Sequence, residues 1–273
     1  MTALPLQGFS AMHSDFLSII TARHCKRAFL ARPVPRETLE AVLTAAAHAP
    51  STRNSQLWQV AVVSGAARQA LSRKLCDCFD RGVAPRLDYL GRPAGLERRF
   101  QERAAAAAAG LLSLKGVARQ DEAGRRSHLR DNFQFYGAPV ELIFHLPRDA
   151  APGSFLEMGF FCQNVMLGLV ARGLASCPQA SVAGYADAIR EFLGLGPDRL
   201  VVCGMAVGYM DGSAPVNGYV PERAPLADYT QWFDEVPGDS AGASGAGDSG
   251  AGDSSAGPRP GHRSLPGGRG PQA

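Results

Sequence analysis

The feature that most constrains the fold is an apolar stretch in the second half of the chain, from Phe155 to Arg172. Apolar residues occupy every side of this stretch instead of a single face. A helix that is apolar all round belongs in the interior of a protein. The small residues Gly159 and Gly168 would also let a second helix approach closely. We therefore expect residues 155–172 to form a buried central helix.

Shorter patterns predict the elements that surround this helix. Apolar residues at helical spacing predict helices over Asp15 to Thr21 and over Arg36 to His48. Apolar, β-branched segments predict strands over Gln59 to Ser64, Glu141 to Leu146 and Leu200 to Val207. Helices and strands are thus expected together in one domain.

Changes in composition suggest where that domain begins and ends. We expect an N-terminal extension over residues 1–14 and one domain over residues 15–236. Within it, residues 68–135 are helical in composition but weakly periodic, which favours a cover or lid. Residues 237–273 are mostly Gly, Ser, Ala, Asp and Pro, and they offer little apolar surface to offset the entropy of ordering. A disordered tail is expected there.

The bulk numbers exclude several classes of protein. The chain of 273 residues is 45% hydrophobic and 19% charged, as in an ordinary soluble protein. Its net charge of +3, with no basic stripe interleaved with aromatics, argues against a nucleic-acid partner. Neither a signal pattern at Met1 to Ser10 nor an uninterrupted run of about 18 apolar residues is present, so we expect a cytoplasmic protein with no membrane partner.

The cysteines do not suggest a scaffold or a metal centre. Six cysteines are too dilute for a disulfide framework. Cys76 and Cys78 are not followed by a second Cys or His pair at zinc spacing. We expect no metal site.

Basic and polar residues gather at points that are far apart in the sequence. Residues 23–27 read Arg-His-Cys-Lys-Arg, Arg223 lies near the end of the expected domain, and residues 49–58 between them are rich in Ser, Asn and Gln. The phosphate and the electron-poor ring of a flavin need cations and donors from several directions, so this set suits a flavin site. The alternative for residues 23–27 is a solvated basic stretch after a helix.

Five motifs in order then point to a family. They are Arg-His-Cys-Lys-Arg-Ala-Phe at 23–29, Ala-Pro-Ser-x-x-Asn-Ser-Gln-x-Trp at 49–58, Gly-Ala-Pro-Val at 137–140, Gly-Leu-Ala-Ser-Cys-Pro-Gln at 173–179, and Val-Gly-Tyr-Met-Asp at 207–211, followed by Arg223-Ala-Pro-Leu. Together they resemble the nitroreductase family of FMN flavoproteins from about Asp15 to Phe233. Each motif alone is weak, but five in the family's order are specific.

The resemblance implies an α+β fold with a mixed, mainly antiparallel sheet flanked by helices. It also implies an intertwined homodimer with an FMN at each end of the interface, so that both sites need both chains. The expected cofactors are FMN and, as electron donor, NADPH or NADH.

The resemblance also assigns residues around the FMN. Arg23 and Cys25 would lie at the phosphate and ribityl chain with His24 alongside, and Arg223 would reach the phosphate. Arg27 would face the N1 and C2 carbonyl edge of the ring. There a fixed cation stabilises the negative charge that reduction creates. The family usually has Ser at the Cys25 position, so a thiol replaces a stronger hydroxyl donor.

A second group of implied contacts lies in the loop after the expected helix 36–48. Pro50, Ser51 and Asn54 would contact the FMN of the partner subunit, and Gln56 is counted with them. We expect Pro50 and Ser51 to end the helix, and Asn54 and Gln56 to begin the strand. The alternative is a plain turn in which Ser and Asn cap backbone groups.

A third group follows the central helix. By resemblance, the backbone of Pro178, Gln179, Ala180 and Ser181 lies along the flavin, with an N–H of Ala180 or Ser181 reaching N5. Cys177 lacks a His partner motif, so a packing role is favoured over a nucleophile.

The function implied is that of an FMN-dependent NAD(P)H oxidoreductase. It would pass a hydride through flavin N5 to a nitroaromatic, a quinone or another flat aromatic acceptor by a ping-pong route. No side chain need act as a catalytic acid, since solvent can provide protons. The alternatives are a reductive dehalogenase or a flavin-fragmenting relative on the same fold, or a non-catalytic flavin-binding protein.

Overall fold

A computed structural model describes residues 9–91 and 95–234, with side chains from Phe16 onward. The tail expected over residues 237–273 lies outside this part of the chain, as does most of the extension expected over 1–14. The chain divides into two compact units, Met1–Glu222 and Arg223–Ala273. The helices and strands that build the candidate site belong to the first unit.

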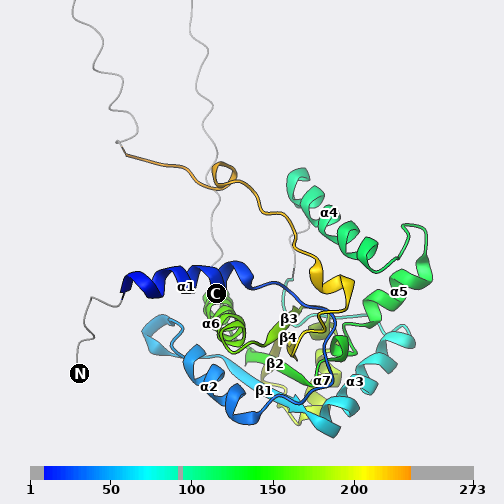
Figure 1. Ribbon diagram of the computed structural model, residues 1–273. Helices are drawn as coiled ribbons and strands as arrows, with labels where there is room; N and C mark the ends of the chain where they lie inside the picture. Colours follow the sequence, from blue (N-terminus) through cyan, green and yellow to red (C-terminus); the bar gives the residue numbers. More distant parts are fainter. Residues whose placement is uncertain (1–8, 92–94, 235–273) are drawn as a thin grey trace, which may run out of the picture. The chain divides into compact units, whose positions relative to one another are not determined.

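The first unit contains both helices and strands (Figure 1). The helices are α1 (Phe9–Ala22), α2 (Arg36–Ala46), α3 (Gly65–Asp80), α4 (Arg98–Leu114), α5 (Glu122–Arg130), α6 (Pro152–Ala171) and α7 (Ala186–Leu193). The strands are β1 (Gln59–Ser64), β2 (Val140–Pro147), β3 (Ala175–Gln179) and β4 (Arg199–Gly208). Short 3-10 turns include Thr52–Asn54, Phe135–Gly137 and Pro215–Gly218.

The four strands form one sheet in the order β1-β2-β4-β3, and each neighbouring pair is antiparallel. A parallel pairing appears at the β3 edge, where Cys25 makes a β-bridge with Ser176. The expected α+β architecture with a mainly antiparallel sheet and flanking helices is confirmed.

One face of the sheet packs against α2 and α6. Because successive side chains of a strand point to opposite faces, alternate residues of β2 share this face. Val140, Leu142 and Phe144 join Met158 and Phe161 of α6 in one buried cluster. Trp58 extends the cluster by stacking on Phe161, with ring centroids 5.1 Å apart.

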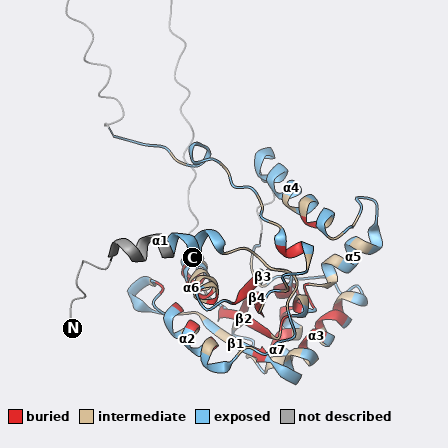
Figure 2. Cartoon of the chain, viewed as in Figure 1, coloured by how far each residue is buried: buried red, intermediate tan, exposed pale blue. Residues whose placement is uncertain are grey.

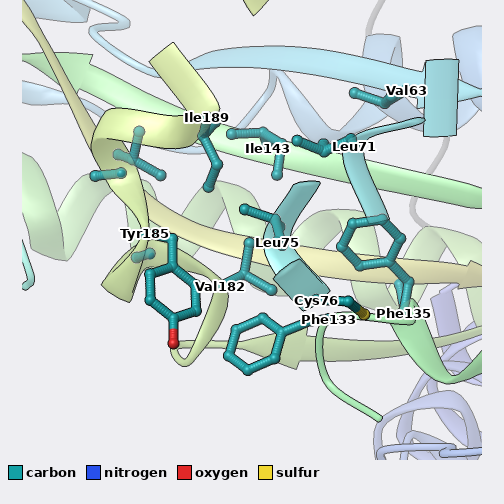
Figure 3. Packing of buried hydrophobic residues seen from close by; sticks show 14 of the residues in the cluster. Val63, Leu71, Leu75, Cys76, Phe133, Phe135, Ile143, Val182, Tyr185 and Ile189 are labelled. Atoms are coloured by element: carbon teal, nitrogen blue, oxygen red, sulfur yellow. The ribbon is translucent and has the colours of Figure 1, made fainter. Parts of the chain in front are cut away.

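The opposite face packs against α3 and α7. Ile143 of β2 meets Leu71 and Leu75 of α3 and Ile189 of α7, all fully buried (Figure 3). Within the segment 68–135 that we expected to be a cover, α3 is therefore part of the core. Leu111 is the one buried residue of α4, and Figure 2 shows most of that helix exposed.

The central helix α6 is buried on one side only. Met158, Phe161 and Val165 face the sheet, whereas Leu156 is 61% exposed and Phe160 is 40% exposed. By length and composition α6 could cross a membrane, but here it packs on the sheet and α2 as a core helix. Within the described part of the chain, Leu156 and Phe160 stay exposed although α1 also contacts α6.

Two expectations about local structure were wrong. Residues 175–179 form the strand β3, where the sequence had led us to expect no strand. Asn54 and Gln56 do not begin β1, which starts at Gln59. Instead they lie in a loop where Arg53, Asn54 and Gln56 all have positive φ angles, of 54°, 57° and 48°.

The described part of the second unit, residues 223–234, contains one short 3-10 turn, Leu226–Asp228. Its aromatic side chains Tyr229, Trp232 and Phe233 are exposed.

Candidate functional site

The basic segment after α1 is fixed to the edge of the sheet. The backbone N–H of Lys26 donates to the carbonyl of Ser176 at 3.1 Å, next to the bridge between Cys25 and Ser176. Arg23, Cys25 and Arg27 are each half-buried. A solvated basic stretch would leave these side chains in water, so the segment is built into the fold.

Asn217 holds the same segment from the other side. Its side-chain oxygen accepts from the backbone N–H of Arg27 at 2.7 Å and of Ala28 at 3.2 Å. Its amide nitrogen donates to the carbonyl of Ala28 at 2.7 Å, and its own carbonyl accepts from Lys26 Nζ at 2.7 Å. Asn217 is buried, and no pattern in the sequence pointed to it.

The guanidinium of Arg27 is positioned by a tyrosine. Burial opposes the charge on Arg27, but the neighbouring Cys177, Tyr136 and Cys25 raise its pKa above the ordinary value, so it stays a cation. The Tyr136 hydroxyl interacts with Arg27 and donates to Asn132 Oδ1 at 2.7 Å. Burial raises the pKa of Tyr136, which keeps this hydroxyl protonated.

The backbone around Tyr136 is strained. Phe135 and Tyr136 have φ angles of 55° and 52°, and Gly137 follows at 80°. Non-glycine residues rarely adopt such angles, and they cost free energy wherever they occur. Such strain clusters at functional sites, and here it places the Tyr136 hydroxyl between Arg27 and Asn132. Tyr136 directly precedes the Gly-Ala-Pro-Val motif, the one signal that could have drawn attention to it.

Residues 177–181 lie beside the basic segment, through the pairing of Ser176 with Cys25. Gln179 is buried and its Nε2 donates to the carbonyl of Asn132 at 2.6 Å, so Asn132 connects Gln179 to Tyr136. Gln179 Oε1 is buried and has no hydrogen-bond partner in the described part of the chain. Pro178, Ala180 and Ser181 are exposed. One chain therefore brings Arg23, Cys25 and Arg27 together with this edge.

Cys25 and Cys177 are adjacent in this arrangement. Both pack in the cluster on the α3 and α7 side of the sheet, and Arg23 Nη1 lies 3.9 Å from Cys25 Sγ. The Cys177 thiol lowers the pKa of Cys25 to about 5, with Arg27 and Arg23 acting in the same direction against burial. Cys177 is only 1% exposed.

His24 points to its own backbone, with Nδ1 3.0 Å from the carbonyl oxygen of Ala22. Arg223 belongs to the second unit, so its expected place at the phosphate stays a prediction.

The loop of residues 50–56 lies well apart from the basic segment in Figure 1. Ser51 Oγ accepts from the backbone N–H of Gln56 at 3.1 Å, and Gln56 Nε2 donates to Asn54 Oδ1 at 2.9 Å. The backbone N–H of Thr52 donates to Glu157 of α6 at 2.8 Å and lowers the pKa of that carboxyl. A single chain thus does not bring Pro50, Ser51, Asn54 and Gln56 to Arg27.

In the described ranges, no group of three or more His, Cys, Asp or Glu side chains lies close enough together to hold a metal ion.

Comparison with known proteins agrees with this architecture. The nitroreductase family matches residues 20–209. A 4-nitrobenzoate reductase of Pseudomonas putida is 35% identical over 218 residues, covering 80% of this chain and 95% of that protein. The nitroreductase NfnB of Mycolicibacterium smegmatis is 36% identical over 214 residues, covering 78% and 91%.

Solved structures are similar as well. The FMN and NADPH-dependent nitroreductase NfnB from Sphigopyxis sp. strain HMH has a TM-score of 0.77 at 37% identity, covering 81% of this chain and 98% of that one. The FMN-dependent NfnB from Mycobacterium smegmatis, in complex with NADPH, has a TM-score of 0.77 at 35% identity, covering 81% and 99%. The chain belongs to the nitroreductase family, as its motifs predicted.

Proposed function

We propose that this protein is an FMN-dependent NAD(P)H oxidoreductase that reduces nitroaromatic compounds and related flat acceptors. The observation that carries the proposal is the half-buried set of Arg23, Cys25 and Arg27, fixed along the β3 edge in a chain of this family. Relatives at 35–36% identity are named for nitroaromatic reduction, and two similar structures are described as FMN-dependent.

The donor set at the β3 edge fits a flavin mononucleotide. Arg23 and Arg27 supply two cations for an anionic cofactor, and charge-assisted hydrogen bonds of this kind are the strong ones. Gln179 Oε1, buried and without a partner in the described residues, can accept a hydrogen bond from a ligand N–H. When bound, FMN supplies the hydride chemistry at N5 of its ring.

The protein's own residues would then do three things. Arg27, held by Tyr136, stabilises negative charge at the N1 and C2 edge of the ring. Arg23 and Arg223 bind the phosphate, with Cys25 and His24 beside the ribityl chain. The exposed edge of Pro178, Ala180 and Ser181, with Gln179 anchored beneath it, presents backbone groups along the ring.

We also propose that the active protein is a homodimer. In one chain the loop of Pro50, Ser51, Asn54 and Gln56 lies apart from Arg27, so a second chain would have to bring it to the flavin. Apolar side chains are exposed on α1 and α6, namely Phe16, Leu17, Leu156 and Phe160. An exposed apolar surface of this kind marks an interaction site.

The compartment we propose is the cytoplasm. The six cysteines are all free thiols, as expected in a reducing compartment.

No observation favours a dehalogenase, a flavin-fragmenting enzyme or a non-catalytic protein over this proposal. An iodotyrosine deiodinase bound to FMN has a TM-score of 0.53 but is 17% identical, and that similarity shows the fold alone.

The proposed function is tested by mixing the purified protein with FMN under anaerobic conditions. We expect a yellow protein whose flavin absorption bleaches when NADPH or NADH is added and returns when 4-nitrobenzoate or a quinone follows. A protein that binds FMN but never bleaches would be a non-catalytic flavin protein. A protein that does not bind FMN would contradict the whole proposal.

The phosphate site is tested by Arg23→Ala. Hydrogen bonds to charged groups contribute about 1.5–3 kcal/mol, so FMN affinity should fall by about 10- to 150-fold. Arg36→Ala is the matched control, because Arg36 is exposed and pairs with Glu40 on the same helix. Equal FMN affinity of the two variants, measured by fluorescence titration, would exclude Arg23 from the site.

A further inference from the structure

Two pairs of cysteines are neighbours in this chain, and their surroundings differ. Cys25 lies beside Cys177, Arg23 and Arg27. Cys203 and Cys162 both pack against the cluster around α6. The neighbouring Cys162 and burial raise the pKa of Cys203 well above its ordinary value. Cys162 and Cys203 can therefore serve as an internal control for Cys25 and Cys177.

The backbone holds Cys25 and Cys177 at a separation that a disulfide can span. Cys25 is bridged to Ser176, the residue that directly precedes Cys177. Bridged backbones lie about 4.7–4.9 Å apart, and one step along a strand is about 3.3 Å, so the Cα atoms of Cys25 and Cys177 are roughly 5.8 Å apart. Disulfides join Cα atoms that are roughly 4.4–6.8 Å apart. Cys25 also packs against the buried cluster that contains Cys177, so both side chains lie on the α3 and α7 side of the sheet.

The two thiols also differ in pKa and in exposure, as the attacking and resolving cysteines of a reactive pair do. The Cys177 thiol, Arg27 and Arg23 lower the pKa of Cys25, which favours its thiolate form. The thiolate is the nucleophilic form of cysteine. Cys25 is half-buried, whereas Cys177 is buried, and the neighbouring Cys25 together with burial raises the pKa of Cys177. A reagent would therefore meet Cys25 first, with Cys177 directly behind it.

We propose that Cys25 and Cys177 are a redox-active dithiol, a modification site for hydroperoxides, and that its oxidation and the binding of FMN exclude each other. Cys25 attacks one oxygen of hydrogen peroxide, the O–O bond breaks, and the departing hydroxide takes up a proton as water. Cys25 is then a sulfenic acid. The Cys177 sulfur attacks the Cys25 sulfur, the S–O bond breaks, and the thiol proton leaves with hydroxide as a second water. One dithiol and one peroxide thus give one disulfide and two waters.

The exclusion of FMN rests on the proposed function, which places Cys25 at the phosphate and ribityl chain. A bound phosphate would cover Cys25 and disfavour its thiolate, because like charges raise the pKa of an acid. Conversely, a disulfide removes the thiol donor and draws the Cys25 side chain toward β3. FMN should therefore protect the dithiol, and the disulfide should weaken FMN binding.

The first arm of the test needs no flavin. FMN-free protein is treated with hydrogen peroxide, the remaining thiols are alkylated with N-ethylmaleimide, and the peptides are identified by mass spectrometry. We expect a disulfide between Cys25 and Cys177 that dithiothreitol reverses, while Cys162 and Cys203 stay alkylated. Cys25→Ser, which carries the hydroxyl usual in the family, and Cys177→Ser should each abolish it, and Cys203→Ser should not. Peroxide that leaves Cys25 and Cys177 reduced, or that links other cysteines first, would overturn the proposal.

The second arm repeats the reaction with FMN-saturated protein, and it uses wild type alone, so it does not depend on how the variants fold. We expect disulfide formation to slow by at least about tenfold, and the oxidised protein to bind FMN at least about tenfold more weakly until it is reduced. Equal rates and affinities would overturn the exclusion. A protein that binds FMN and turns over but forms no disulfide contradicts this inference alone. A protein that forms the disulfide but never binds FMN contradicts the proposed function and the exclusion.

Discussion

At the scale of single residues, Arg27 has the charge and position to act on a flavin ring, and Tyr136 decides where that charge lies. The Tyr136 hydroxyl is shared between Arg27 and Asn132 Oδ1. The positive φ angles of Phe135 and Tyr136 cost conformational free energy, so the hydroxyl is placed there at the expense of backbone strain. Tyr136 is thus a positioning residue, since it acts through Arg27.

Tyr136→Phe should make the midpoint potential of bound FMN more negative and lower turnover by about tenfold, the equivalent of about 1.4 kcal/mol. Without the hydroxyl, Arg27 is less firmly held against the edge of the ring that gains charge on reduction. Spectroelectrochemical titration measures the potential. Tyr185→Phe is the matched control, because it also removes one hydroxyl, which donates to the carbonyl of Val83 at 3.2 Å. If both variants keep the wild-type potential, Tyr136 has no positioning role.

Glu141 is a second residue whose protonation state depends on burial. Neither of its carboxylate oxygens has a side-chain partner in the described part of the chain, and burial raises the pKa of Glu141 well above its ordinary value. The unfolded chain releases this proton at about pH 4.3, whereas the folded chain keeps it. The stability that Glu141 contributes is therefore complete below the unfolded pKa and is lost as pH rises toward the folded pKa.

Glu141→Gln should accordingly gain stability relative to wild type as pH rises above about 4.3, by up to about 1.4 kcal/mol per pH unit. Urea unfolding at several pH values between 4 and 8 measures this difference. Glu157→Gln is the control, because the Thr52 N–H lowers the pKa of Glu157. The contribution of Glu157 changes only below about pH 4.3, so the difference between Glu157→Gln and wild type should stay nearly constant at higher pH. A difference between Glu141→Gln and wild type that stays constant over this range would mean that Glu141 is not protonated in the folded protein.

At the scale of elements, the sequence predicted what periodicity and β-branched content reveal. The strand over 59–64 was placed correctly, and those over 141–146 and 200–207 were each one residue short at both ends. The strand β3 was not predicted from the sequence because it is short and contains Pro178. Proline is tolerated there because β3 is an edge strand. The backbone strain around Asn54 and Tyr136 was not predicted, because most of the positive φ angles belong to non-glycine residues, which rarely adopt them.

The packing of the central strands gives a prediction at this scale. Gly204 of β4 lies beneath Glu141, and an added Cβ would overlap Glu141 Oε1 and lie 3.0 Å from Val182 Cγ1. Gly204→Ala should lower the free energy of unfolding by about 1–3 kcal/mol, the usual cost of overpacking a core. Gly153→Ala, where a Cβ would meet no atom within 4 Å, should change it little. Thermal or urea unfolding measures both, and equal stabilities would show that β4 shifts freely.

At the scale of the whole molecule, the fold explains which candidate residues meet and which do not. The motifs at 23–27 and 173–179 meet because the first pairs with the edge of β3. The loop at 50–56 stays apart, and no pattern within one chain could show which second surface it serves. The position of Arg223 is likewise not given by the first unit. The homodimer was expected from the family resemblance. The exposed apolar residues on the outer side of α6 provide a way to test it.

Replacing Leu156 and Phe160 together by Glu should dissociate the proposed dimer and lower FMN affinity by at least about tenfold. Two charges would be placed on an apolar surface that the partner is proposed to cover, and the desolvation of a charge is costly. Both side chains point away from the core cluster of α6, so the monomer should still fold. Val62→Glu on the edge strand β1 is the control, since Val62 is also exposed. Sedimentation velocity and FMN content measure the outcome. If the doubly substituted protein remains a dimer, the interface does not include Leu156 and Phe160. If it is a monomer that still binds FMN fully, Ser51 and Asn54 do not contact a partner's cofactor.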